Sequence, residues 1–394
     1  MPAISPLDTV EATVRRRGSD LVELSHAIHA QPELAFAEHR SCAKAKELVA
    51  QRGFQINPVD GLDTAFRADF GSGPLVVGVC AEYDALPDIG HACGHNIIAA
   101  SGVGAALALA EVADELGLTV ALLGTPAEES GGGKVLMLRA GAFDDVAVAV
   151  MVHPGPSDIA GARSLALSEV TVTYRGKESH AAVAPFLGRN AADAVTVAQV
   201  AIGLLRQQLA PGQMMHGIVT EGGQAVNVIP GLAALKYATR AVEYDSLREL
   251  EGRMYACFAA GALAAGCEYE INEAGPAYAE LRPDQWLADV CRDEMRRLGR
   301  EPVAAAVEAA LPLGSTDMGN VTHVLPGIHP VIGVDAGGAT VHQRAFAAAA
   351  AGPSADRAVV EGAIMLARTV VALAADPEQR DRVLAARRRR AVAT

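Results

Sequence analysis

Residues 76–95, VVGVCAEYDALPDIGHACGH, combine an apolar run with side chains that bind metal ions. The apolar run, residues 76–80, is rich in β-branched residues and too short for a helix, which predicts a buried parallel strand. Cys93 and His95 follow at alternate positions of a loop, so both can point at one ion. Asn96 is expected to cap the helix that comes next. A thiolate together with an imidazole suits zinc or another borderline divalent metal. The alternative is a buried cysteine beside loop histidines that only satisfy backbone carbonyls.

Two adjacent carboxylates, Glu128 and Glu129, follow a second apolar run at residues 118–125. Neighbouring side chains beyond the end of a strand point in different directions. One carboxylate can therefore bind a metal while the other faces the attacking water, and a general base beside a metal is what amide hydrolysis requires. The alternative is a helix N-terminus that carries acidic residues.

A third apolar run, residues 146–152, ends directly at His153. Open α/β sheets bind ligands beyond the carboxyl ends of their strands. Strands that end in the cysteine–histidine loop, the paired glutamates and His153 therefore predict one metal site at a single edge of the sheet.

The pattern of helices and strands changes near residue 166. Upstream, apolar strands alternate with helices, and the same pattern resumes at residue 276. Between these points, strands with one-sided alternation and two amphipathic helices follow in the order βαββαβ, which predicts a ferredoxin-like unit. We therefore expect an α/β domain with a mixed sheet flanked by helices, formed by residues 1–166 and 276–394 and carrying the metal site. An α+β insert, residues 167–275, would interrupt it as a dimerisation or lid domain.

The insert is the expected site of homodimer formation. A small βαββαβ unit leaves a sheet edge exposed, and exposed edges are unfavourable unless they are covered or paired. Pairing two inserts edge to edge would cover both edges in a symmetric interface.

Charge and hydropathy exclude several classes of protein. The chain has 394 residues and a formal net charge of −13, which argues against a nucleic acid or an anionic membrane as partner. It contains no run of about 20 apolar residues, the length that a membrane span needs. The N-terminus lacks the apolar core of a secretion signal, and the six cysteines show no CxxC motif or regular spacing. We therefore expect a cytoplasmic protein with free thiols.

Six motifs keep one order along nearly the whole chain: HACGHN, TPAEES, MVHPG, GKESHAA, GGQAVNVIP and GSTDMGN. Together they resemble the dinuclear metal amidohydrolases, a family of aminoacylases, carboxypeptidase-G-type enzymes, dipeptidases and auxin-conjugate hydrolases. The nearest branch is that of p-aminobenzoyl-glutamate hydrolase and the β-alanyl-lysine-type dipeptidases. The resemblance implies two divalent ions, zinc or manganese. It also implies a small-molecule substrate, an N-acyl- or aminoacyl-amino acid, whose amide bond is cleaved by activated water.

The resemblance further implies a role for each matched residue. Glu128 would be the general base, and Asp84 would orient a metal ligand. His180 of the insert would stabilise the oxyanion in the site of the other subunit, while Asn227 and Arg240 would bind the substrate's carboxylate. The metal ligands would be Cys93 in the bridging position, His95, Glu129, His153 and His342.

Some residues near the motifs have no assigned role. They are Glu82, which stands where a better-known branch of the family has histidine, and His91, His323 and His329. Two other functions stay open, an N-carbamoyl- or hippurate-type aminoacylase and a non-catalytic metal-bound scaffold protein. Glu128 beside a full set of ligands favours an enzyme, because a non-catalytic protein would need neither.

Overall fold

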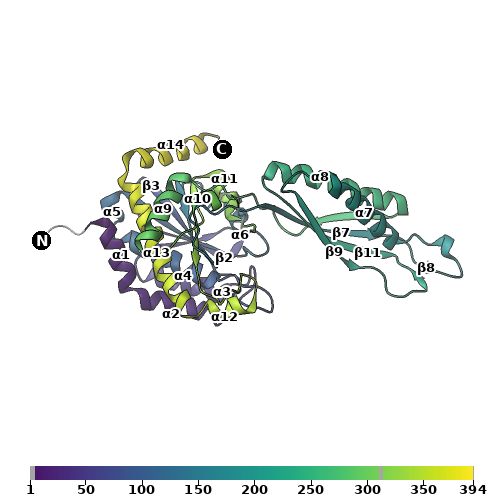
Figure 1. The fold of residues 1–394 in the computed structure, drawn as a ribbon, viewed down its shortest axis with the longest axis horizontal. Coiled ribbons are helices and arrows are strands. Elements are labelled where there is room, and N and C mark those ends of the chain that lie inside the picture. Colours follow the sequence, from purple (N-terminus) through teal and green to yellow (C-terminus); the bar gives the residue numbers. More distant parts are fainter. Residues whose placement is uncertain (1–4, 309, 311–313, 394) are drawn as a thin grey trace. The chain divides into compact units, whose positions relative to one another are not determined.

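The computed structural model describes residues 5–308, 310 and 314–393. The chain folds into two compact units, one built from Met1–Arg163 together with Leu281–Thr394, the other from Ser164–Glu280. Figure 1 shows the elements of each unit. The insert thus begins at residue 164 and ends at residue 280, where the sequence pattern suggested 167 and 275.

A six-stranded mixed sheet forms the centre of the first unit, in the order β1-β2-β4-β3-β5-β13. Strands β4, β3, β5 and β13 run parallel, while β2 pairs antiparallel with both β1 and β4. This architecture confirms the predicted fold class. The strands are β1 Gln55–Val59, β2 Leu62–Gly71, β3 Leu75–Glu82, β4 Leu118–Thr125, β5 Val148–Val150 and β13 Gly327–Ile328, and a separate parallel pair is formed by β6 His153–Gly155 and β14 Val331–Gly333.

The two faces of this sheet pack against different helices, as the alternation of side chains along β3 requires. Val77 and Val79 face a large core that includes α4 and α13, whereas Val76 and Cys80 face a smaller core with α6 and α11. Every residue of β3 is buried. The helices of this unit are α1 Pro6–Arg16, α2 Gly18–His29, α3 His39–Ala50, α4 His95–Ala110, α5 Ala113–Leu116, α6 Gly133–Arg139, α9 Gln285–Arg297, α10 Ala305–Glu308, α11 Met318–Val324, α12 Arg344–Ala349, α13 Pro353–Ala375 and α14 Pro377–Ala393.

Helix α4 begins earlier than predicted, and its cap differs. Gly94 is the N-cap residue, with φ of 77°, and a Cβ at this position would come within 2.5 Å of the Pro154 ring. Only glycine adopts this conformation in so tight a place without strain. Asn96 does not cap the helix, because its side-chain amide donates to Ser25 Oγ and to the carbonyl of Ala350, each at 2.8 Å.

Helix α13 is long and apolar enough, by length and composition alone, to cross a membrane. Within the unit, 78% of its most apolar window is buried, and it packs against α4, α1 and α9. Its apolar character is thus that of a core helix.

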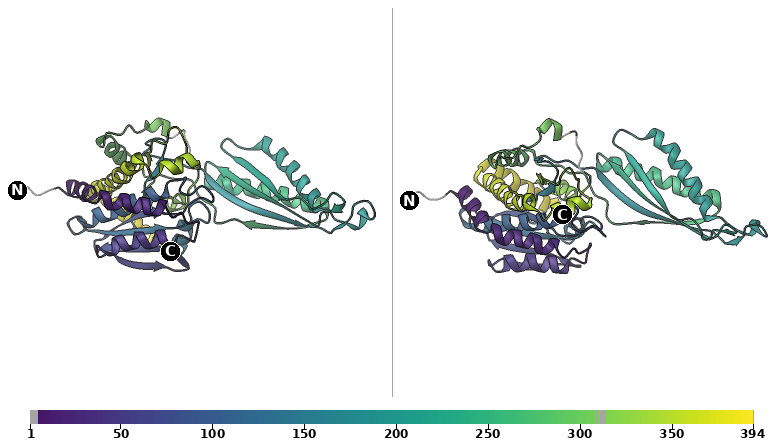
Figure 2. Two further views of the ribbon diagram at one scale, coloured as in Figure 1. Left: turned by 90° about the horizontal axis from the view of Figure 1, so that it is seen from below. Right: turned by 60° about the horizontal axis from the view of Figure 1, so that its bottom comes forward.

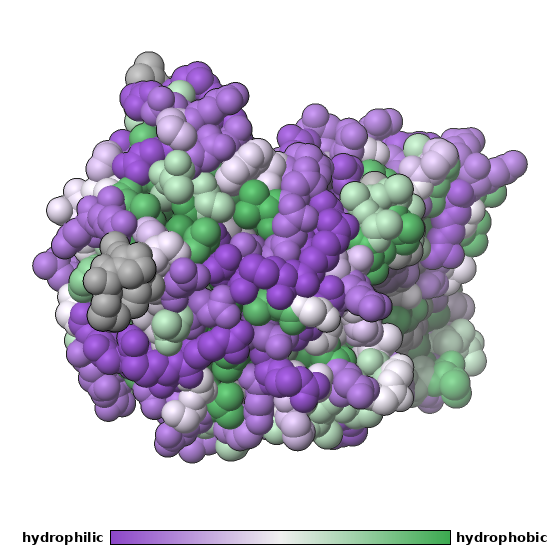
Figure 3. All heavy atoms as spheres, turned by 60° about the vertical axis from the view of Figure 1, so that its left-hand side comes forward, coloured by the Kyte–Doolittle hydropathy of each residue, from purple (hydrophilic) through white to green (hydrophobic). Residues whose placement is uncertain are grey.

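The surface seen in Figure 3 is mostly hydrophilic, and the apolar side chains on it form small separate areas.

The second unit is a four-stranded antiparallel sheet in the order β12-β7-β11-β9, with α7 and α8 together on one face (Figure 2). Numbered within the unit, its strands lie in the order 4-1-3-2, which is the ferredoxin-like arrangement that the sequence predicts. Its elements are β7 Ala166–Arg175, β8 Ser179–His180, η1 Pro185–Leu187, α7 Ala191–Leu205, η2 Arg206–Gln208, β9 Met214–Glu221, β10 Val228–Ile229, β11 Leu232–Ala241, α8 Tyr244–Ala265 and β12 Glu268–Glu273.

Candidate metal centre

The five predicted metal ligands lie beyond the carboxyl ends of the parallel strands and in one later loop. Cys93 and His95 follow β3, Glu129 follows β4, His153 is the first residue of β6, and His342 lies in the loop before α12. Cys93, His95 and His153 place ligand atoms within 4.8 Å of one another, and so do Cys93, Glu129 and His342. Cys93 belongs to both groups, which is the placement that a ligand shared by two ions requires.

Asp84 fixes the orientation of two neighbours. One of its oxygens accepts a hydrogen bond from His95 Nδ1 at 2.8 Å, and the other accepts the backbone N–H of Glu129 at 2.9 Å. His95 therefore donates from Nδ1 to Asp84 and directs Nε2 into the site. A carboxylate that orients a metal-binding histidine in this way is common in metal sites, and the family resemblance implies this role for Asp84.

His153 is held in the same manner by the backbone. Its Nδ1 donates to the carbonyl oxygen of Pro154 at 2.6 Å, and its Nε2 lies 3.4 Å from Cys93 Sγ. Burial lowers the pKa of His153. The imidazole is thus neutral, and the lone pair of Nε2 is on the side of Cys93, which is the form that binds a metal.

His342 reaches the site through an unusual backbone conformation. Its φ is 65°, in the left-handed region, and its N–H donates to the carbonyl oxygen of Ala92 at 2.8 Å. Its Nε2 lies 3.4 Å from Glu129 Oε2. Left-handed backbone is uncommon for a residue other than glycine and is often retained at functional sites. Here it ties the C-terminal loop to the loop that carries Cys93.

Carboxylates surround His95 in a way that calls for a cation. Nε2 lies 3.6 Å from Glu82, 3.8 Å from Glu128 and 3.8 Å from Glu129, in addition to the bond from Nδ1 to Asp84. Nε2 has no hydrogen-bond partner among the described residues, and neither have Glu82 Oε2 and Glu129 Oε1. Burial of uncompensated charge and of unpaired polar atoms is costly. Divalent ions would satisfy both needs, so the residues present fit a metal centre.

The same charges control the protonation of the nitrogen and sulfur ligands. Burial acts to lower the pKa of His95, but the Asp84 carboxylate outweighs it and holds this pKa well above its ordinary value. Burial and the Glu129 carboxylate raise the pKa of the Cys93 thiol. Metal ions displace protons from such ligands, so we expect metal binding to release protons from this site.

The paired glutamates have different electrostatic environments. Burial raises the pKa of Glu128 well above its ordinary value, and the neighbouring carboxylates of Glu82 and Glu129 add to this. Burial also acts to raise the pKa of Glu129, but the hydrogen bond from His342 and the charges of His95 and His342 together outweigh it, and the pKa is lowered. Environments that push the pKa values of two carboxyls apart are typical of groups with separate roles.

His180 and Asn227 lie together in the second unit. Strand β8 pairs with β10 so that His180 is opposite Val228, and the carbonyl oxygen of Asn227 accepts the N–H of Ala181 at 2.9 Å. His180 Nδ1 accepts the backbone N–H groups of Ala182 and Val183, each at 3.2 Å. Since Nδ1 is an acceptor, the neutral ring carries its proton on Nε2, where the exposed side chain can donate it.

Arg240 lies at the other end of the same unit. It is near the end of β11, opposite Leu167 of β7 and Met214 of β9. The β8–β10 pair precedes the start of β11 at Leu232. Arg240 is eight positions after Leu232 along this strand, so the two residues are about 26 Å apart at the usual rise per residue. Arg240 and Asn227 of one chain are therefore not side by side, as binding of one carboxylate by both would require.

Sequence reasoning missed a buried ion triad beneath the ligands. Lys134 Nζ lies 2.5 Å from Glu82 Oε1 and 2.6 Å from Asp317 Oδ1, and all three side chains are fully buried. Lys134 follows a glycine cluster at the start of a helix, where a lysine is normally solvated, so no local signal marks it.

Two of the histidines without a predicted role lie beside other histidines. His329 packs edge-on against His153, with ring centroids 5.3 Å apart, and His91 is buried beside His29.

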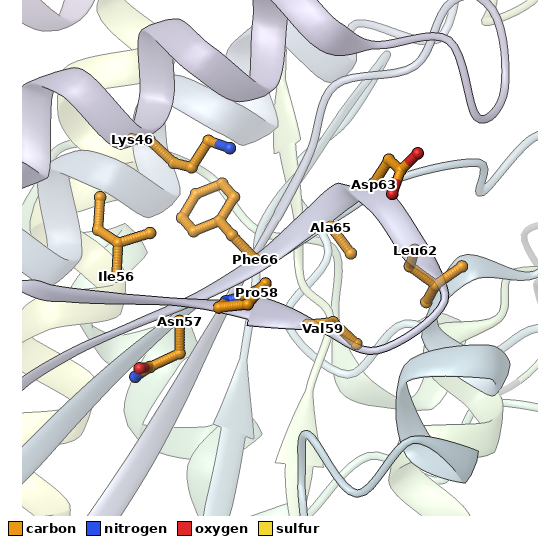
Figure 4. A pocket seen from close by; sticks show the side chains of 9 residues that line it. All are labelled: Lys46, Ile56, Asn57, Pro58, Val59, Leu62, Asp63, Ala65 and Phe66. Carbon is orange, nitrogen blue, oxygen red and sulfur yellow. The ribbon is translucent and has the colours of Figure 1, made fainter.

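A shallow hollow of about 310 Å³ lies elsewhere on the first unit, between α3 and the β1–β2 hairpin (Figure 4). The Lys46 ammonium group lies 5.9 Å from the centroid of the Phe66 ring there. None of the predicted metal ligands lines this hollow. The cluster of ligand side chains, rather than this hollow, is the candidate functional site.

Comparison with known proteins identifies the family of the chain. The sequence profile described as "Peptidase family M20/M25/M40" matches residues 78–370. The chain belongs to this peptidase family. It is a hydrolase, and the predicted family relationship is confirmed.

The similar proteins include dipeptidases and a p-aminobenzoyl-glutamate hydrolase subunit. The chain is 42% identical over 330 residues to the Xaa-Arg dipeptidase of Mus musculus, across 79% of this chain and 77% of the relative. It is 37% identical over 374 residues to the Homo sapiens protein of the same name, across 90% of this chain and 86% of that relative. A p-aminobenzoyl-glutamate hydrolase chain of Escherichia coli is 32% identical over 269 residues, across 63% of this chain and 55% of the relative.

A solved structure from Bacillus subtilis, described as a dinuclear metal binding peptidase from the M20 family, has the same fold. It superposes with a TM-score of 0.65 at 22% identity, covering 91% of this chain and 99% of the other.

Proposed function

We propose that this chain is a metal-dependent dipeptidase that hydrolyses the amide bond of an aminoacyl-amino acid. The observation that carries the proposal is Cys93, shared by two groups of ligands, with the buried Glu128 beside them. Cys93, His95, Glu129, His153 and His342 would hold two divalent ions, zinc or manganese. Such ions would supply electrophilic activation of the amide carbonyl and of the attacking water.

Glu128 is the general base in this proposal. It takes a proton from the attacking water and then passes it to the nitrogen of the leaving amine. A base works best when its pKa lies near the operating pH. Burial beside Glu82 and Glu129 raises the pKa of Glu128, and cations in the site would lower it again. The balance leaves a carboxylate that can both accept and return a proton.

A dipeptide with a basic C-terminal residue is the proposed substrate. This choice rests on the Xaa-Arg dipeptidases, to which the chain is 42% and 37% identical over most of its length. Arg240 would bind the free carboxylate that every dipeptide carries, since a guanidinium fork matches a carboxylate in two parallel hydrogen bonds. The match to p-aminobenzoyl-glutamate hydrolase favours an aryl-glutamate conjugate as the second candidate.

A homodimer would complete each site in this proposal. A dipeptide spans about 7 Å when extended, so it is too short to contact both His180 and Arg240 of one insert, which β11 separates by about 26 Å. His180 of one chain would therefore donate from Nε2 to the oxyanion in the other chain's site. Strand β9 is an edge of its sheet and exposes Met214, Ile218 and Val219, so it suits edge-to-edge pairing of two inserts.

A hydrolysis panel tests the substrate. We expect the highest kcat/KM with aminoacyl-arginine and aminoacyl-lysine dipeptides. Values for dipeptides with a C-terminal glutamate, p-aminobenzoyl-glutamate and N-acyl, hippuryl or N-carbamoyl amino acids should be lower. The C-terminal amides of the best dipeptides should show a raised KM because they lack the carboxylate. A preference for p-aminobenzoyl-glutamate or for acyl amino acids would contradict the dipeptidase assignment, and no cleavage of any of them would contradict the enzyme class proposed.

A further inference from the structure

Glu82 is the last residue of β3 and has only one of its two oxygens engaged. Oε1 accepts from Lys134 Nζ at 2.5 Å. Oε2 has no hydrogen-bond partner among the described residues, although the side chain is fully buried. A buried carboxylate oxygen without a donor is unfavourable unless a cation faces it.

The free oxygen of Glu82 faces the free nitrogen of His95. Glu82 Oε2 lies 3.6 Å from His95 Nε2, and both atoms lack a hydrogen-bond partner within the described chain. Because Asp84 occupies the other nitrogen of His95, Nε2 is the atom available to a metal. Two ligand atoms of a tetrahedral zinc ion are about 3.4 Å apart, given usual zinc–ligand distances. Glu82, His95 and Glu128 also place ligand atoms within 4.8 Å of one another.

Lys134 and Asp317 hold Glu82 in this orientation. Lys134 Nζ bridges Glu82 and Asp317, while the second oxygen of Asp317 accepts the backbone N–H of Lys134 at 2.8 Å. Asp317 thus has both oxygens engaged, whereas Glu82 keeps one free. By formal charge the triad combines two carboxylates with one ammonium group in a fully buried position, an excess of one negative charge that a cation would compensate.

We propose that Glu82 is a further metal ligand of this centre, binding through Oε2 the ion that His95 holds. Lys134 and Asp317 are positioning residues that keep Oε1 away from the ion and Oε2 directed at it. This inference rests on the proposed two-ion centre and adds one carboxylate to its five side chains. It explains why a lysine, normally a surface residue, is fully buried next to a site that binds cations.

The test compares Glu82→Gln with Asp317→Asn. Each variant removes one negative charge from the same triad and leaves an amide oxygen to accept from Lys134 Nζ, so the two are matched in charge and burial. Asp317→Asn also loses the acceptor for the backbone N–H of Lys134. Only Glu82→Gln weakens the oxygen that faces His95. We measure metal equivalents per chain by elemental analysis after dialysis, and metal affinity by competition with a chelator. Glu82→Gln changes a proposed ligand, so we expect the affinity for one of the two ions to fall by more than about 100-fold, beyond the usual cost of losing a partner that only orients a ligand. Asp317→Asn, which only weakens the positioning of Glu82, should lose no more than about tenfold.

Wild-type metal affinity in Glu82→Gln would overturn the inference. An equal loss of metal affinity in both variants would also overturn it, because the triad would then act only through its total charge or through folding. The melting temperature of each metal-free variant separates a folding defect from a loss of metal binding. If Glu82→Gln does not fold, Glu82→Asp carries the test, because it keeps the charge but withdraws the carboxylate; wild-type affinity in that variant would overturn the inference. A wild-type chain that binds no divalent ion would instead remove the proposed two-ion centre, and the two failures are distinguishable.

Discussion

Replacing Glu128 with glutamine is expected to lower kcat by about 10²–10⁴-fold, the usual contribution of general acid–base catalysis, with both metal ions still bound. The amide keeps the size of the buried side chain but cannot take a proton from water. Glu128 is buried, and its pKa is raised by burial and by the carboxylates of Glu82 and Glu129. Steady-state kinetics with an aminoacyl-arginine dipeptide give kcat, and elemental analysis of the same samples gives the metal content.

Glu129→Gln is the matched control for this variant. Glu129 accepts from His342 and shares a ligand group with Cys93, so its loss should lower metal content first and activity in consequence. The added metal needed for half-maximal activity should rise in Glu129→Gln and stay unchanged in Glu128→Gln. Equal metal content in the two variants together with equal activity would show that the carboxylates do not divide the work as proposed.

Mixed dimers of His180→Ala and Glu128→Gln chains are expected to regain activity that neither variant has alone. If His180 acts in the site of the other subunit, one site of each mixed dimer contains an intact Glu128 and an intact His180. Such a dimer should turn over at about half the wild-type rate, since one of two symmetric sites is complete. The separation of His180 from Arg240 by the length of β11 is the structural reason to expect this arrangement.

Two affinity tags allow the mixed dimer to be purified and assayed. Glu128→Gln mixed with Glu129→Gln is the control, because both residues belong to the same unit and every site in that mixed dimer lacks one of them. It should not recover. Absence of recovery in a verified His180→Ala and Glu128→Gln dimer would place His180 in its own chain's site or outside catalysis.

The strand ends and their ligands could be predicted because their signals are local. An apolar run of β-branched residues that stops at a polar side chain marks both a buried strand and its carboxyl end. Strand β4 spans Leu118–Thr125, the residues of the predicted run, and the side chains that follow β3, β4 and β5 meet at one edge of the sheet. Even the order of the insert's strands follows from its βαββαβ pattern.

Features that depend on distant residues could not be predicted in this way. The burial of Lys134 depends on Glu82 and Asp317, which lie 52 and 183 residues away. Asn96 was expected to cap α4 because it stands near the helix start, but its partners Ser25 and Ala350 belong to α2 and to the residues after α12. In both cases the side chain takes its role from tertiary contacts that override a local preference.

Titration of metal-free protein with zinc or manganese, while hydrolysis of an aminoacyl-arginine dipeptide is followed, tests the central claim most directly. The account predicts no turnover without added metal and a rise in rate that is complete at about two equivalents per chain, as expected for a two-ion site. Full turnover in protein shown by elemental analysis to lack metal, or a rate that is already complete at about one equivalent, would contradict it.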